Sequence, residues 1–295
     1  MRWFRKIAAT FGDVRMPGLN GIWGHPFLDL ERYFDLSVLP LLHEEICLGL
    51  AHVAPSYTGG SLKWMKVVSP SAWTDPYLDY GHVIGRFSLD EFDRFVKLAD
   101  NHERFDRSRF KEYAFGDETD HPLNYAQMKY LKYRYGVYFP WKVAFHFVEN
   151  DSWEDKHRGK GKRFSKASEE YFPKTVAFLR ALPFREIGRC LVFGLEANDH
   201  APFHRDTEPR SRHDVEHTMT ICPNGDKRFV LTDETESDFL IVPTRAYWFN
   251  DMDFHGVAPD PFFRYSIRID GVYEDWFFER LRNDWGAGKV HQVDW

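Results

Sequence analysis

The segment HAPFHRDTEP (200–209) carries the residues whose types and spacing best suit catalysis. His204 and Asp206 stand two positions apart, and on an extended strand such residues point to the same face. His255 follows Asp206 by 49 residues, within the run AYWFNDMDFHGVA. Two histidines and one carboxylate occupy one face of an octahedral metal and leave three positions open, an arrangement that suits non-haem iron(II). The sequence therefore predicts that His204, Asp206 and His255 are both metal ligands and catalytic residues.

A second group of polar residues alternates along the run FRYSIRIDGVY (263–273). Arg264, Ser266 and Arg268 share one face if this run is a strand. Arg264 lies nine residues after His255, and a guanidinium can grip a carboxylate with two parallel hydrogen bonds. We expect Arg264 and Ser266 to bind a carboxylate, with Arg268 as the alternative one strand repeat further along.

This ordered set resembles the motif of the iron(II)/2-oxoglutarate-dependent oxygenases. The family pattern is His-x-Asp, then about fifty residues, a distal His, and an Arg-x-Ser roughly ten residues further on. The matching elements are His204-Arg205-Asp206, His255 and Arg264-Tyr265-Ser266, and the resemblance covers about residues 189–273. The stretch RAYWFNDMDFHGVAPDPFFRYSIRIDG (245–271) is also loosely similar to the aspartyl/asparaginyl and proline hydroxylase branches.

The resemblance implies a double-stranded β-helix, or jelly-roll (cupin-like), core with the metal at its open end. It implies iron(II) as cofactor and 2-oxoglutarate and dioxygen as co-substrates, with succinate and carbon dioxide released. Arg264 and Ser266 would hold the distal carboxylate of 2-oxoglutarate. A carboxylate ligand at Asp206 favours hydroxylation over halogenation.

Other histidines compete for the metal. His200 and His204 are four residues apart, as are His213 and His217, and zinc-binding helices use this spacing. Pro202 and Pro209 disfavour a helix at either place. Neither pair is therefore the predicted primary site.

The elements around these motifs are mainly extended. The sequence predicts a mainly β fold with flanking helices (α+β), because short strands recur along the second half. Asn224-Gly225 suits a tight hairpin between two of them. Helices are predicted over 88–105, with Ser88 as N-cap, and over about 168–181, while 127–135 fits a helix or a strand. The predicted strands are 143–148, 189–197, 217–222, 227–233, 238–243, 246–250 and 263–273.

The chain changes character near residue 165. We expect residues 1–165 to form a mixed helical region that shapes the substrate side, and 166–295 to form the catalytic core within one integrated domain. The basic loop 156–166 could be a lid, an anion-binding patch or a solvated loop. Its Lys160, Lys162 and Arg163 are candidate substrate contacts. Trp248 and Asn250, on one face of a predicted strand, are further candidates.

Composition narrows the function classes. The 295 residues carry a formal charge of −6, which argues against a nucleic-acid partner. No run of 18 uncharged apolar residues predicts a membrane span, and the N-terminus lacks the apolar core of a secretory signal. Three distant cysteines indicate a reducing compartment. We therefore expect a cytoplasmic protein; its oligomeric state does not follow from the sequence.

The leading hypothesis is an oxygenase that hydroxylates a small polar metabolite, an amino acid or a natural-product intermediate. One alternative is a peptide or protein side-chain hydroxylase of the same chemistry. Another is a zinc-dependent hydrolase or isomerase on a cupin-like barrel, which would use the same three ligands with a metal-bound water. A third is a non-catalytic module that binds anionic surfaces through its basic loop.

Overall fold

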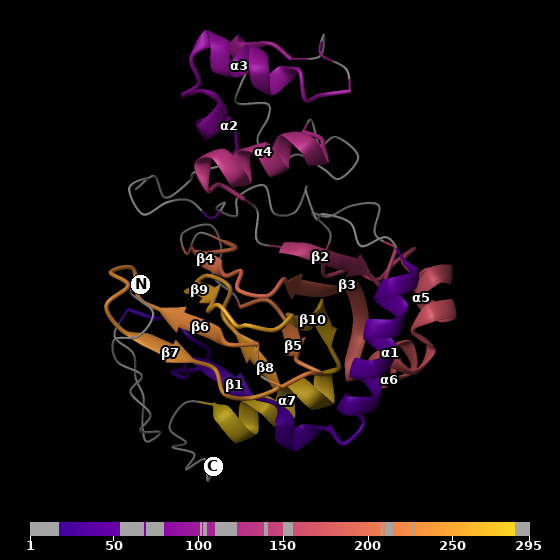
Figure 1. The fold of residues 1–295 in the computed structure, drawn as a ribbon. Coiled ribbons are helices and arrows are strands. Elements are labelled where there is room, and N and C mark those ends of the chain that lie inside the picture. The colour runs from indigo at the N-terminus through magenta and orange to yellow at the C-terminus, as the bar shows by residue number, and fades with distance from the viewer. Residues whose placement is uncertain are drawn as a thin grey trace.

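Two antiparallel β-sheets form the body of the protein in a computed structural model (Figure 1). The larger sheet has the order β1-β8-β5-β10-β3-β2, and the smaller has the order β4-β9-β6-β7. The structure describes residues 18–53, 68, 80–100, 102, 105–109, 123–138, 141–149, 156–207, 209, 215–225 and 227–286. The strands are β1 (Phe27–Asp29), β2 (Trp141–His146), β3 (Phe184–Leu195), β4 (Ala201–His204), β5 (Thr218–Ile221), β6 (Phe229–Thr232), β7 (Phe239–Ile241), β8 (Ala246–Phe249), β9 (Phe254–Val257) and β10 (Arg264–Tyr273). The mainly β, α+β prediction is confirmed.

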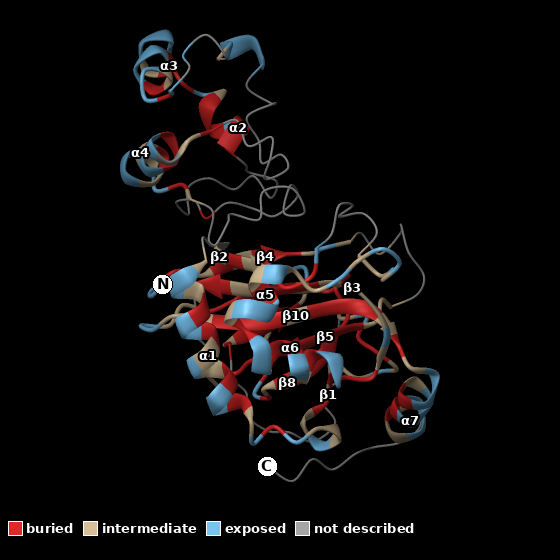
Figure 2. Ribbon diagram, turned by 90° about the vertical axis from the view of Figure 1, so that its right-hand side faces the viewer, coloured by how far each residue is buried: buried red, intermediate tan, exposed pale blue. Residues whose placement is uncertain are grey.

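Helices occupy two places around these sheets. One group packs against the outer face of the larger sheet, and a second group lies together beyond one end of the sheets (Figures 1 and 2). The first group is α1 (Leu39–His52), α5 (Lys166–Tyr171), α6 (Pro173–Arg180) and α7 (Asp275–Trp285), and the short 3-10 helix η1 (Glu31–Tyr33) precedes α1. The second group is α2 (Tyr80–Ile84), α3 (Leu89–Val96) and α4 (Tyr125–Tyr135). No helix in the described ranges has the length and apolar character needed to cross a membrane.

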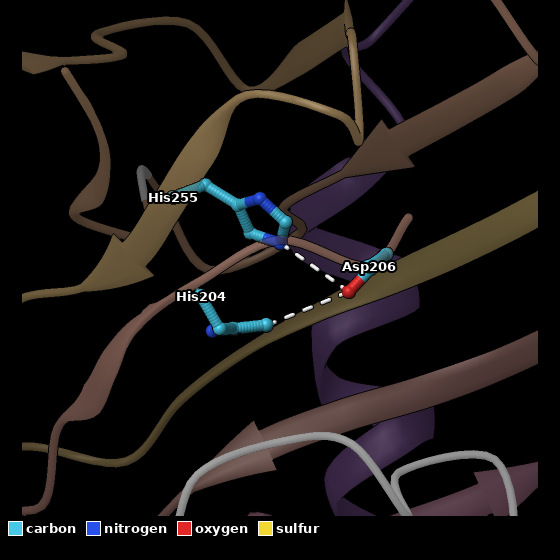
Figure 3. Close-up of side chains that lie close together, drawn as sticks. All are labelled: His204, Asp206 and His255. Atoms are coloured by element: carbon cyan, nitrogen blue, oxygen red, sulfur yellow. Dashed lines mark ion pairs between the residues drawn. The ribbon is translucent and has the colours of Figure 1, made fainter. Parts of the chain in front are cut away.

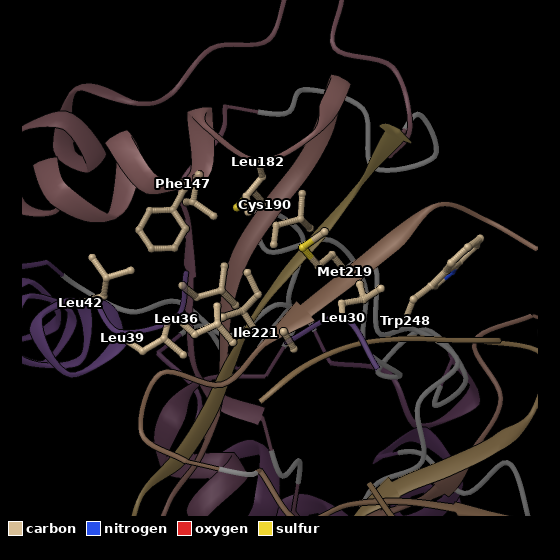
Figure 4. Close-up of a cluster of buried hydrophobic side chains, with 14 of the residues drawn as sticks. Leu30, Leu36, Leu39, Leu42, Phe147, Leu182, Cys190, Met219, Ile221 and Trp248 are labelled. Carbon is tan, nitrogen blue, oxygen red and sulfur yellow. The ribbon is translucent and has the colours of Figure 1, made fainter. Parts of the chain in front are cut away.

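Two hydrophobic clusters separate the faces of the larger sheet. On its outer face, Ile267 and Ile269 of β10 join Leu39 of α1 and Leu281 of α7 in one buried cluster (Figure 4 shows part of it). The other cluster combines residues of both sheets with apolar residues of α2–α4. Because side chains alternate along a strand, the even-numbered residues of β10 face away from the isoleucines and toward the smaller sheet.

Local chemistry explains where several helices begin and end. Ser88 caps α3 and Asn124 caps α4, each through a reciprocal capping box. The predicted helix over 88–105 is therefore confirmed only in its first half, and 127–135 lies within a helix. The predicted helix over 168–181 is broken at Pro173, because proline lacks the N–H that would continue the first segment.

The predicted hairpin at Asn224-Gly225 is wrong. Gly225 does adopt a positive φ of 98°, as a tight turn requires. However, β5 belongs to the larger sheet and β6 to the smaller. The turn therefore carries the chain across the space between the sheets rather than folding one strand back onto its neighbour.

The first part of the chain contributes to the sheets as well as to the helices. β1 and β2 form the two edges of the larger sheet, and Lys132 of α4 lies 3.8 Å from Asp199 in the turn before β4. The described α2–α4 group thus meets the start of β4, whereas His204 is at its end. The division near residue 165 and its substrate-side role stay predictions.

Gly256 allows β4 and β9 to lie close together. A Cβ atom at this position would be 2.8 Å from the carbonyl oxygen of Ala201 and 3.0 Å from the ring of Phe203. We expect Gly256→Ala to lower the free energy of unfolding by about 1–3 kcal/mol, because overpacking displaces backbone. Chemical denaturation measures this change.

The matched control is Gly159→Ala, whose added Cβ would meet its nearest atom at 3.4 Å. The free energy of unfolding of this variant is expected to stay within about 0.5 kcal/mol of the parent value. Alanine restricts the unfolded chain more than glycine does, which adds a small stabilisation. Equal unfolding free energies for the two variants would show that β4 and β9 tolerate a wider spacing.

Candidate metal centre

Pairing of β4 with β9 brings two of the predicted ligands together. His204 and His255 are directly opposite each other in the antiparallel register, and their ring centroids are 4.4 Å apart. Both side chains are buried, with 3% and 4% of their surface exposed. His255 lies 49 or more positions after the other two predicted ligands, yet it meets His204 in one small volume, as the motif predicts.

Asp206 reaches the same place by a different route from the one predicted. β4 ends at His204, so strand alternation does not orient Asp206. Instead its backbone N–H donates to the carbonyl oxygen of Asp251 at 3.0 Å. Asp206 Oδ1 then lies 3.5 Å from Nε2 of His204 and 3.5 Å from Nε2 of His255 (Figure 3).

The histidine rings are oriented with Nε2 toward this centre. Nδ1 of His204 bonds the carbonyl oxygen of Pro202 at 2.8 Å, and Nδ1 of His255 bonds that of Asp253 at 2.9 Å. A carbonyl can only accept, so each Nδ1 carries the proton and each Nε2 holds a lone pair. His204 Nε2 is buried and has no hydrogen-bond partner among the described residues.

These features fit a metal ion. One ligand atom from each of the three residues lies within 4.8 Å of the others. Burial, together with the nearby His255, lowers the pKa of His204 and favours the neutral ring that a metal needs. Burial would raise the pKa of Asp206, but His255, His204 and Arg268 outweigh it and hold that pKa well below its ordinary value. The centre therefore offers a neutral nitrogen at His204, the Nε2 of His255 and a carboxylate.

The three polar residues of β10 have different partners. Arg264 lies 3.3 Å from Asp260 and donates to the carbonyl oxygen of Asn224 at 3.1 Å. Ser266 is buried, and Arg268 forms ion pairs with Asp206 at 3.2 Å and with Asp270 at 3.2 Å. Arg268 is thus committed to acidic residues beside the metal centre.

Lys227 is a buried cation that the sequence analysis did not single out. Its side chain donates to the hydroxyl of Ser266 at 2.7 Å and to the carbonyl oxygen of Phe193 at 2.9 Å. Its pKa is lowered to about 7, mainly by burial, with a smaller contribution from Arg268 and an opposing one from Cys222. Fully buried lysines are rare, but a lysine at the start of a predicted strand gives no sequence signal of burial.

Trp248 and Asn250 are both engaged in contacts with other parts of the chain, and their role toward a substrate stays a prediction. Trp248 belongs to the outer hydrophobic cluster, and its indole N–H donates to the carbonyl oxygen of Glu216 at 2.8 Å. Asn250 donates to the carbonyl oxygen of Gly21 and accepts from the N–H of Met252. Each side chain therefore has a structural partner.

The described part of the basic loop is anchored. Gly159 N–H donates to Glu186 at 2.8 Å, and Phe164 forms a β-bridge with Val148. Lys160 and Arg163 are exposed, and Arg163 pairs with Glu149 at 2.8 Å. The first residues of the loop, rather than its glycine-rich middle, approach the metal centre, because Lys156 lies 3.5 Å from Asp251.

The competing histidine pairs are not assembled into a second cluster. His213 lies outside the described residues, and His217 accepts from the N–H of Tyr273 at 3.1 Å while stacking on its ring. Within the described ranges, the one group of three potential ligands is His204, Asp206 and His255. His200 is not part of it.

Comparison with known proteins found similarity to solved structures alone. No family model matches the chain, and no curated protein matches its sequence. Similar solved structures include an oxidoreductase of the 2OG-Fe(II) oxygenase family from Burkholderia pseudomallei, with 14% identity and a TM-score of 0.28, over 43% of this chain and 66% of that one.

Two further similar structures are prolyl hydroxylases. One is a prolyl-4-hydroxylase from Pseudomonas putida, with 11% identity, a TM-score of 0.25, and coverage of 44% of this chain and 71% of that one. The other is a prolyl hydroxylase from Trichoplax adhaerens in complex with a hypoxia inducible factor peptide fragment, with 16% identity, a TM-score of 0.26, and coverage of 46% and 74%. In structure the chain thus resembles 2OG-Fe(II) oxygenases and prolyl hydroxylases.

Proposed function

We propose that this chain is an iron(II)- and 2-oxoglutarate-dependent oxygenase. The observation that carries the proposal is the arrangement of His204 Nε2, His255 Nε2 and Asp206 Oδ1 around one point, with the buried Nε2 of His204 lacking a hydrogen-bond partner among the described residues. Two histidines and one carboxylate with three open positions suit non-haem iron(II), which must bind a co-substrate and dioxygen together.

The strand order supports a double-stranded β-helix as the core. From β3 to β6 successive strands alternate between the larger and the smaller sheet, and from β7 to β10 they do so again. Each sheet of the core therefore receives four of these eight strands. One hydrophobic cluster joins residues of both sheets, together with apolar residues of α2–α4. The metal centre lies where β4 ends and β9 begins.

The chemistry divides between the metal and the protein. Iron(II) with dioxygen would supply the oxidative decarboxylation of 2-oxoglutarate to succinate and carbon dioxide, with one oxygen atom of dioxygen entering succinate and the other entering the substrate. His204, His255 and Asp206 would hold the metal. The carbonyl oxygens of Pro202 and Asp253 fix the orientation of the two rings, with Nε2 turned toward the metal position.

The inner face of β10 supplies groups for the distal carboxylate of 2-oxoglutarate. Arg264 and Ser266 are the proposed partners, and the ammonium of Lys227 on Ser266 adds a second cation. The acidic partners of Arg268 beside the metal favour Arg264 over Arg268 for this role. A dicarboxylate clamp of this kind has no use in a zinc hydrolase or isomerase.

The proposed substrate is a small polar molecule, with Lys160, Lys162 and Arg163 as its contacts at the basic loop. A peptide substrate is the alternative outcome. Succinate release measured across a panel of amino acids, other polar metabolites and proline-containing peptides decides between them. Hydrolysis that depends on zinc, with no succinate released in the presence of iron(II) and 2-oxoglutarate, would contradict the proposed function.

Removal of a histidine ligand should abolish activity. His204→Ala and His255→Ala are expected to lose iron and 2-oxoglutarate turnover, because two remaining ligands hold the metal weakly and in the wrong geometry. Iron content after anaerobic reconstitution and succinate release are the measurements. His200→Ala is the matched control and should keep both; full iron occupancy in an Asp206→Ala, His255→Ala double variant would overturn the ligand assignment.

Loss of the guanidinium at position 264 should act on the co-substrate. Arg264→Ala is expected to weaken binding of 2-oxoglutarate by about 2–5 kcal/mol, since it removes a partly buried charged partner. The apparent constant for 2-oxoglutarate measures this at saturating iron. Arg228→Ala is the control, because Arg228 shares the partner Asp260 at 3.6 Å. A rise in the apparent constant for 2-oxoglutarate with Arg268→Ala but not with Arg264→Ala would reverse the assignment.

Lys227 should make binding of 2-oxoglutarate depend on pH. With its pKa lowered to about 7, the lysine is charged below that pH and neutral above it, so affinity should fall as pH rises past about 7. Calorimetry on the manganese-loaded protein should show proton uptake on binding, seen as an enthalpy that changes with the buffer. Lys227→Met should bind more weakly at pH 6 and show no such uptake; an unchanged pH profile in that variant would exclude the lysine.

Neutralising the basic loop tests its role toward the substrate. A Lys160→Gln, Lys162→Gln, Arg163→Gln triple variant is expected to raise the Michaelis constant of an anionic substrate severalfold, because it removes the three positive charges that the proposal assigns to substrate binding. Iron and 2-oxoglutarate affinities should stay within about twofold. Lys174→Gln, an exposed lysine on α6, is the control, and an unaltered Michaelis constant in the triple variant would leave a solvated loop.

A further inference from the structure

Asp206 is the one ligand of the metal centre that no strand holds, and a chain of charged residues surrounds it. We propose that Arg268 is a positioning residue that fixes Asp206 as a one-oxygen metal ligand, with Asp251 and the loop residue Lys156 as its support. This inference rests on the metal site of the proposed function. It assigns Arg268 to the metal ligand rather than to the co-substrate.

The two oxygens of Asp206 face different partners. Oδ1 lies 3.5 Å from both histidine nitrogens, at His204 and His255, whereas Oδ2 lies 3.2 Å from Nη1 of Arg268. An oxygen engaged by a guanidinium is a poor second ligand for the same metal, because the cation draws on its lone pairs. Asp206 would therefore bind through one oxygen and leave three positions open.

Arg268 is itself held on several sides. Its Nε donates to Asp270 at 3.2 Å, and Asp270 also accepts from Arg189 at 2.6 Å. The guanidinium lies over the ring of Phe249, 5.4 Å from its centroid. Burial opposes the charge of Arg268, but Asp270, Asp206 and Asp251 outweigh it and raise its pKa. The planar guanidinium suits this position because it meets several carboxylates at fixed angles.

The backbone of Asp206 depends on the same group of residues. Its N–H donates to the carbonyl oxygen of Asp251, and the Asp251 carboxylate lies 4.0 Å from Arg268 and 3.5 Å from Lys156. Lys156 also pairs with Glu216, which His157 approaches at 3.0 Å. Lys156, at the start of the basic loop, thus supports Asp251, which holds the backbone N–H of Asp206. The backbone and the carboxylate of Asp206 are therefore both constrained.

The test compares metal binding in variants that differ in one ion pair. Arg268→Gln removes the partner of Asp206 Oδ2, while Arg189→Gln removes a partner of Asp270 and leaves Asp206 untouched. Cobalt(II) titration of the apo protein, followed by visible absorption, reports both affinity and coordination geometry without turnover. Thermal unfolding of each apo variant reports whether it is folded. Arg268→Lys restores the positive charge without the planar guanidinium and its parallel N–H donors.

We expect Arg268→Gln to weaken cobalt(II) binding by about 10–100-fold and to alter the visible spectrum, because Asp206 can then turn or bind with both oxygens. Arg189→Gln should stay within about threefold with the parent spectrum, and Arg268→Lys should recover part of the affinity. Lys156→Met, at the far end of the chain of charges, should lose less cobalt(II) affinity than Arg268→Gln. It keeps the test valid if the Arg268→Gln variant does not fold.

Two results separate the inference from the proposed function. If Arg268→Gln binds cobalt(II) as the parent does, with the same spectrum, and instead weakens 2-oxoglutarate, Arg268 is a co-substrate ligand and the inference is wrong. If the parent protein binds neither cobalt(II) nor iron(II), the proposed function itself fails. Equal losses in Arg189→Gln and Arg268→Gln would also overturn the inference, since they would show a general effect of the buried charges.

Discussion

The close approach of β4 and β9 is the constraint on which the candidate site depends. Their antiparallel register sets His204 directly opposite His255, and antiparallel pairing brings opposed side chains within about 5 Å. Gly256 permits this spacing because a side chain there would overlap the backbone of Ala201. β6 pairs with the other side of β9 and places Leu231 beside His255, so the distal ligand is fixed on both sides.

The second constraint is electrostatic. Asp251 and Asp270 are buried beside the candidate metal centre, next to the more exposed Asp206, and burial of carboxylates is costly unless they are paired. Arg268 meets all three of them. A bound divalent cation would reduce the negative charge further, so the pairing and the metal act in the same direction.

Sequence reasoning succeeded where a local pattern carries the information. The spacing of His204, Asp206 and His255 predicted a cluster that the structure assembles, and most strands were recognised from alternation. It was wrong where the answer depends on distant partners. Asn224-Gly225 has the chemistry of a tight turn, but turn chemistry does not reveal which sheet the next strand joins. The roles of Lys227 and Asp251 were also missed, since nothing in their neighbours along the chain indicates that they are buried beside groups from other strands.

The place of β10 in the larger sheet has a consequence for how the protein is made. β10 is the last strand among the described residues, yet it lies between β3 and β5 and completes both pairings. Contacts between residues so far apart in sequence form slowly, because the chain must close a long loop first. On the ribosome, β3 and β5 must wait without their shared neighbour until nearly the whole chain has emerged, which exposes open strand edges to association with other chains. The ion pair between Arg268 and Asp206 likewise forms only once β10 is in place, because β10 carries that arginine.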